Sequence, residues 1–215
     1  MKMLRNFTIR FVMLTILGIF CVMWAGVGLY STWSLSRVSD GNDVDRQLVR
    51  QMTVLSQGND QYFRFVTRLS RAMEVKAAGG TPDLAPAQQA LDNMSKKLAE
   101  MKAISPGPMD EKVSAQVIST WQALLDRGVT PQMAQAKQAT LEGYRQHANN
   151  VTPPLSRAFG AAAENFNNTA AKALDSTRVV VDGLTSMTRT VIITATIVGL
   201  LILLFTDRYL VAILV

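Results

Sequence analysis

The sequence contains very few cysteine and histidine residues, the residues that form disulfides and most often bind zinc. It has one cysteine and one histidine in 215 residues, so it can form no internal disulfide and offers no zinc-ligand spacing. The single cysteine, Cys21, lies inside an uncharged apolar run. We therefore expect no metal and no cofactor.

Catalytic motifs are missing as well. The sequence has no GxSxG nucleophile turn and no phosphate-binding glycine loop, and its glycine pair, Gly79 and Gly80, suits the end of a helix. The neighbouring acids Asp110 and Glu111 fit a helix start, where negative charge is stabilised by the helix dipole. We expect no catalytic residues and no enzymatic activity.

A clustered basic face is also missing. The net charge is +6, but residues 31–188 hold 17 Lys and Arg against 15 Asp and Glu. The remaining positive charge lies beside apolar runs, on the N-terminal tail and Arg189. Nucleic-acid surfaces combine clustered basic residues with stacking aromatics, so we expect no nucleic-acid partner.

Two long apolar runs dominate the ends of the chain. Residues 11–30 contain no charge, and residues 190–206 form a second uncharged run flanked by Arg189 and Arg208. At about 1.5 Å per residue, a helix over the first run matches the roughly 30 Å hydrocarbon core of a bilayer. This run exceeds the apolar stretch of about 7–15 residues in a signal peptide. The sequence therefore predicts two transmembrane helices.

Basic residues before the first run predict the orientation. Lys2, Arg5 and Arg10 have no acidic neighbour, and positive charge close to a span stays in the cytoplasm. We therefore predict a multi-pass protein whose parts are a cytoplasmic tail (1–10), a first transmembrane helix (11–30), a periplasmic domain (31–188), a second transmembrane helix (189–206) and a short segment (207–215).

Proline clusters predict the helix ends of the outer domain, because proline inside a helix costs about 3 kcal/mol. The seven prolines fall into four clusters. We expect helices over 31–78, 86–104, 109–127 and from 153 onward, with one or two short helices in 131–150 that complete the third leg.

Apolar residues spaced alternately four and three apart predict that the first and fourth helices pack along each other. The first set is Leu48, Met52, Leu55, Asn59, Tyr62, Val66, Leu69 and Met73; the second is Leu155, Phe159, Ala162, Phe166, Thr169, Ala173, Ser176 and Val180. The predicted fold is all-α: an up-down-up-down four-helix-bundle ectodomain between two transmembrane helices.

Four motifs make the chain resemble the periplasmic half of bacterial methyl-accepting chemotaxis receptors, especially the aspartate and serine receptors. They are TRLSRAM (67–73), WQALLDRGVTPQM (121–133), VTPPLSRAF (151–159) and DRYLV (207–211). DRYLV, directly after the second span, is similar to the start of a HAMP linker, so we interpret 207–215 as a truncated HAMP. The resemblance implies an inner-membrane homodimer that acts on a cytoplasmic kinase and coupling protein.

Three arginines are the first candidates for ligand binding. Arg64, Arg68 and Arg71 lie at i, i+4 and i+7, within an arc of roughly 60° at about 100° per residue. Guanidinium groups bind carboxylates bidentately, which predicts an anion site. The alternative is a solvated face on which Asp60 pairs with Arg64 and Glu74 with Arg71.

The resemblance adds candidates near the start of the fourth helix. The family's L-S-R motif matches residues 69–71, which implies that Arg71 contacts a ligand held between two subunits. The family's Q-P-T turn is replaced by a T-P-P turn that begins at Thr152. Thr152 either supplies a hydroxyl to the ligand or caps the helix. Tyr144 and His147, one helical turn apart, offer hydrogen-bond donors to the same pocket or are ordinary surface residues.

We therefore expect a transmembrane chemoreceptor that senses a small, carboxylate-bearing periplasmic molecule, an organic acid or an amino acid. Membrane lipid surrounds its two spans. Two alternatives stay open: the sensor half of a membrane histidine kinase or diguanylate cyclase, and a structural anchor without a ligand. The segment that follows HAMP distinguishes the first alternative from a chemoreceptor.

Overall fold

The computed structural model describes residues 2–138 and 140–214, with side chains for residues 11, 13–138 and 140–208. Its elements are α1 (Lys2–Ala77), α2 (Ala85–Ile104), α3 (Glu111–Ala123), the π-helix η1 (Leu124–Val129), α4 (Thr130–Gln138), α5 (Leu141–Gln146), the π-helix η2 (His147–Val151) and α6 (Thr152–Leu214). The described residues include no strand, so the predicted all-α class is confirmed. The side chains of the predicted tail 1–10, and of residues 209–215 in the predicted HAMP start, lie outside the described residues.

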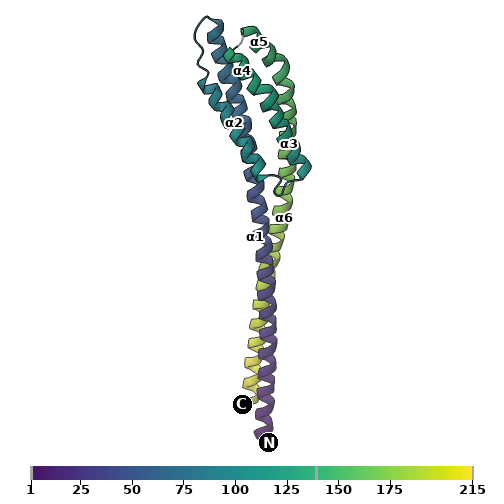
Figure 1. Cartoon of the computed structure of the whole chain (residues 1–215). Coiled ribbons are helices and arrows are strands. Elements are labelled where there is room, and N and C mark those ends of the chain that lie inside the picture. Colours follow the sequence, from purple (N-terminus) through teal and green to yellow (C-terminus); the bar gives the residue numbers. More distant parts are fainter. Residues whose placement is uncertain (1, 139, 215) are drawn as a thin grey trace. The chain divides into compact units, whose positions relative to one another are not determined.

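The chain forms two compact units. The bundle unit is Val44–Ser176, and the span unit consists of the parts of α1 and α6 outside it. In the bundle unit, four legs run in alternating directions: α1, α2, α3 with η1 and α4, and α5 with η2 and α6 (Figure 1). This arrangement confirms the predicted four-helix bundle.

One apolar core holds the four legs together. Its largest buried side chains come from three of them: Phe65 of α1, Trp121 of α3, and Phe159 and Phe166 of α6. The rings of Trp121 and Phe159 lie 5.3 Å apart between centroids. Burying one large apolar side chain contributes about 1.5–3 kcal/mol, so these rings are a main source of bundle stability.

The two π-helices explain why two predicted helix boundaries are wrong. Proline collides with the carbonyl four residues earlier, which for Pro131 is Arg127, inside η1. In this wider turn the Thr130 N–H bonds to the carbonyl of Leu125, five residues back, so the leg continues through Pro131 to Gln138. In the same way, η2 leads directly into α6 before Pro153. Residues 141–151 therefore begin the fourth leg and do not complete the third.

The predicted packing face of the first helix is only part of the buried face. Leu48, Leu55, Leu69 and Met73 are buried as expected, but Phe65 is buried as well. A helix in a bundle contacts more than one neighbour, so its apolar face is wider than a two-helix seam.

For α6 the end of the predicted face is wrong: Ala173 packs against the core, but Ser176 and Val180 are exposed. Val180 is 61% exposed, whereas Ala170 and Leu174 are buried. After Phe166 the next buried residue is Ala170, four residues later. The predicted alternation of four and three residues would instead bury Thr169, three residues later. A straight helix has 3.6 residues per turn and drifts about 20° per heptad from a 3.5-residue repeat, which accounts for the shift.

In the span unit, α1 and α6 approach each other at small residues. A methyl group on Gly41 would lie 2.6 Å from Val181 Cγ2, and one on Gly199 would lie 3.2 Å from Phe20 Cε2. Small residues at such positions allow close helix packing in lipid. Both helices are long and apolar enough to cross a membrane, in agreement with the predicted spans.

Candidate ligand-binding site

The three arginines predicted as an anion site do not converge on one cavity. The Arg64 Nε lies 2.7 Å from a carboxylate oxygen of Asp60, and both side chains are about half exposed. Arg68 Nη1 donates a hydrogen bond of 3.0 Å to the carbonyl of Pro86, at the start of α2. Arg71 is exposed. Two members of the stripe thus have partners within the bundle unit, and Arg71 is the member turned to solvent.

Thr152 and Tyr144 meet at a buried glutamine that the sequence analysis did not single out. Thr152 Oγ1 donates to Oε1 of Gln132 over 2.8 Å, and both residues are buried. Tyr144 is buried and is also hydrogen-bonded to Gln132. Because η2 runs into α6 without a break, Thr152 begins no separate helix, and its hydroxyl ties the third leg to the fourth instead of capping a helix.

His147 joins the two π-helices. Its Nε2 lies 2.9 Å from the carbonyl oxygen of Gly128 in η1. A carbonyl only accepts hydrogen bonds, so Nε2 carries a proton and donates it. His147 therefore connects η2 to η1. In the sequence it lies between Tyr144 and Thr152.

A cavity of about 320 Å³ lies between α1 and the α5–η2 segment. Its lining residues are Ser70, Met73, Glu74, Ala77, Leu141, Tyr144, Arg145, Ala148 and Asn149. Of the six predicted site residues, only Tyr144 lines this cavity, which we call the α1–α5 pocket.

The polar side chains that line the pocket carry one positive charge, one negative charge and three neutral hydrogen-bonding groups. Arg145 supplies a cation, Ser70, Tyr144 and Asn149 supply neutral hydrogen-bonding groups, and Glu74 supplies one negative charge. The described residues contain no cluster of three or more potential metal ligands.

Sequence reasoning did not single out the pocket residues Ser70, Arg145 and Asn149, and it considered Glu74 only as a partner of Arg71. One available signal was spacing, since Ser70 and Glu74 lie four residues apart on α1, and Arg145 and Asn149 lie four apart on the next segment. Residues four apart share a helix face, so each pair pointed to one polar face. Which two faces meet was decided by the packing of the bundle.

Burial raises the pKa of Tyr144 above its ordinary value of 10.0; Glu74 raises it further, and the hydrogen bond to Gln132 opposes this shift. The phenol therefore keeps its proton at neutral pH. The folded protein also holds this proton more tightly than the unfolded chain does, so stability is lost as pH rises above about 10.

We predict that Tyr144→Phe removes this alkaline component. At pH 7 the variant should be about 1 kcal/mol less stable, because it loses the hydrogen bond to Gln132. Between about pH 9 and pH 11 the wild-type protein should lose stability faster than the variant. Urea unfolding across this range measures both effects, and parallel pH profiles would contradict the prediction.

A family model and a solved structure match this chain. A family model described as the Tar ligand binding domain homologue matches residues 3–174. A crystal structure described as the N-terminal ligand-binding domain of a methyl-accepting chemotaxis protein from Salmonella enterica is 66% identical, with a TM-score of 0.61; the match covers 62% of this chain and 98% of that chain. No curated protein that was compared with this chain matches it.

Proposed function

Because this chain belongs to the family of Tar ligand-binding-domain homologues, we propose that it is a transmembrane chemoreceptor whose periplasmic bundle binds a small carboxylate-bearing molecule in the α1–α5 pocket. The family is a ligand-binding one, and the solved relative is described as part of a chemotaxis protein. The two apolar helices are candidate spans of a membrane protein.

The arrangement around Arg145 carries the proposal. Arg145 and Tyr144 are neighbours in α5 and both line the pocket, so a bound carboxylate meets a guanidinium group and a phenol that keeps its proton. Charge-assisted hydrogen bonds of this kind are about twice as strong as neutral ones. Glu74, on the α1 side, favours ligands that also carry an ammonium or hydroxyl group and disfavours a second carboxylate at its position.

A homodimer would add Arg71 to this site. Two apolar side chains on α1 lie outside the buried face: Val49 is 46% and Phe63 is 58% exposed. We propose that this face packs against a second copy. Arg71 follows the pocket residue Ser70 in α1 and is exposed. In this dimer the Arg71 side chain of one copy would reach the ligand bound in the pocket of the other copy.

The proposed signal path begins beside the pocket. Asn149 lies in η2, which leads without a break into α6, and α6 extends to Leu214. If η2 has two positions and the ligand binds one of them more tightly, binding raises the population of that position. Because η2 continues into α6, α6 moves with it. We propose that the N-terminus is cytoplasmic, residues 31–188 are periplasmic, residues 207–215 begin HAMP, and the output is a cytoplasmic kinase with its coupling protein at the bacterial inner membrane.

A ligand panel tests this function. The experiment measures the thermal unfolding of residues 31–188 in the presence of monocarboxylic acids, dicarboxylic acids, amino acids, neutral sugars and amines. We expect at least one acid or amino acid to raise the melting temperature, by an amount that grows with its concentration. Stabilisation by sugars alone, or by nothing in the panel, would contradict a directly sensed carboxylate.

A further inference from the structure

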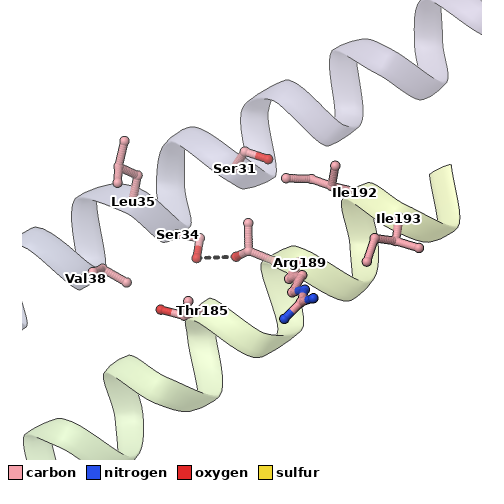
Figure 2. A pocket seen from close by; sticks show the side chains of 9 residues that line it. Ser31, Ser34, Leu35, Val38, Thr185, Arg189, Ile192 and Ile193 are labelled. Atoms are coloured by element: carbon pink, nitrogen blue, oxygen red, sulfur yellow. Dashed lines mark hydrogen bonds between the residues drawn. The ribbon is translucent and has the colours of Figure 1, made fainter. Parts of the chain in front are cut away.

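A second cavity of about 640 Å³ lies within the span unit, between α1 and α6. In Figure 2 the Ser34 side chain points toward the facing helix, and its Oγ lies 2.6 Å from the Thr188 Oγ1. Ser34 is only 2% exposed. The two hydroxyls hydrogen-bond to each other, and both residues line the cavity. We call this cavity the α1–α6 groove.

The groove combines an apolar wall with one cation. Leu35 and Val38 of α1 and Ile192 and Ile193 of α6 supply the wall, and Arg189 supplies the charge (Figure 2). Among the residues that the structure describes, no carboxylate forms an ion pair with Arg189. An exposed guanidinium beside apolar side chains suits an amphiphilic anion.

Ser31 provides a second unused polar group. Its hydroxyl is buried and has no hydrogen-bond partner among the described residues, and Ser31 lines the groove. A buried polar atom without a partner loses its hydrogen bonds to water and gains none in return, so it favours an occupant that donates or accepts there. Phosphate and ester oxygens accept hydrogen bonds from hydroxyls.

The level of the groove in the sequence agrees with a headgroup region. Ser31 directly follows the first apolar run, which ends at Tyr30, and Arg189 directly precedes the second, which starts at Thr190. Both lining segments therefore lie at the same end of the two spans. The inference rests on the proposal that these runs cross a bilayer.

We propose that the α1–α6 groove binds one phospholipid of the leaflet next to the bundle unit, with its phosphodiester on Arg189 and Ser31 and its acyl chains along the apolar wall. A second copy of the chain is the competing occupant. At this level it offers no counter-charge, because residues 11–39 and 183–206 contain no acidic residue. A lipid phosphate supplies the anion that a second copy lacks.

The test uses the whole chain in detergent with added dioleoylphosphatidylglycerol, whose headgroup carries no ammonium to compete with Arg189. Native mass spectrometry should detect a one-to-one lipid adduct. Arg189→Gln should weaken this adduct about fivefold, the usual effect of one basic residue near an anionic lipid. Ser31→Ala should weaken it about twofold. Glycerol phosphate without acyl chains should not displace the lipid.

Arg37→Gln is the matched control. Arg37 lies on α1 near the same level, but it stacks over the Trp33 ring at 5.8 Å and does not line the groove. Equal loss in both arginine variants would show diffuse surface attraction and overturn the proposal, as would no loss in Arg189→Gln.

Two further outcomes separate the remaining possibilities. Crosslinking of Leu35→Cys between two copies at saturating lipid would overturn the proposal by placing a second chain in the groove. Failure of the chain to float with lipid vesicles would instead overturn the membrane topology, and the groove proposal would fall with it. Flotation with an adduct that depends on Arg189 supports both.

Discussion

Gly58→Ala should lower the free energy of unfolding of the bundle by about 2 kcal/mol, although alanine is the better helix former. A methyl group on Gly58 would overlap the Trp121 ring, at Cζ2 and Cη2. Trp121 is fully buried and packs on Phe159, so the ring cannot move away. Overpacking of this kind costs about 1–3 kcal/mol, more than the roughly 1 kcal/mol that alanine gains in helix propensity.

Gly160→Ala is the control for this prediction. Gly160 lies in α6, and a methyl group there has open space around it. This substitution should therefore raise stability by about 0.5–1 kcal/mol. Urea unfolding of residues 31–188 measures both changes with opposite expected signs.

A double-mutant cycle identifies the cause. In a Trp121→Leu background the ring is gone, so Gly58→Ala should be neutral or stabilising. If Gly58→Ala were equally harmful with and without the ring, the close contact with Trp121 would not be the reason that glycine occupies position 58.

Arg145→Gln should weaken binding of the carboxylate ligand about tenfold. Hydrogen bonds to charged groups contribute about 1.5–3 kcal/mol, and Arg145 is exposed, which places it at the lower end of this range; 1.4 kcal/mol corresponds to tenfold in the dissociation constant. Isothermal titration with the most stabilising acid of the panel measures the change. Glutamine keeps a polar end group on a shorter stem and removes the guanidinium, so the lost guanidinium accounts for the effect.

Arg157→Gln supplies the comparison for charge alone. Arg157 is exposed on α6 and does not line the α1–α5 pocket, so its loss should change affinity by less than about twofold. Arg64→Gln should behave similarly, because Arg64 is paired with Asp60. Affinity that falls in Arg64→Gln and not in Arg145→Gln would move the site back to the arginine stripe.

The predicted arginine site shows what sequence spacing can predict and what it cannot. The spacing of Arg64, Arg68 and Arg71 correctly places them on one face of α1, because helix geometry alone decides that. Their partners depend on the bundle: Arg68 bonds to the carbonyl of Pro86 on α2. The cation that lines the pocket, Arg145, stands beside the predicted Tyr144, and its spacing of four from Asn149 does not show which face of α1 it meets.

The helix ends show a second limit. Gly79 was correctly placed just beyond the first helix; it has a positive φ of 81°, a conformation that glycine adopts without strain. Pro131 was wrongly assigned to a boundary, because the cost of a proline depends on whether the preceding turn widens. Here η1 provides that wider turn. The spacing of prolines along the sequence does not indicate where a π-helix forms.

The amino-acid sequence by itself determined the helical class, the two apolar runs and the family resemblance, because these depend on composition, on the 3.6-residue period and on local motifs. Only the tertiary structure decided which face of α6 is buried, how Gln132 links Tyr144 to Thr152, and which side chains line the α1–α5 pocket. Those features depend on contacts between residues far apart in the chain. The sequence pattern leaves neighbouring faces of a helix almost equally apolar. A small rotation of the helix that accumulates along its length then decides which of these faces is buried.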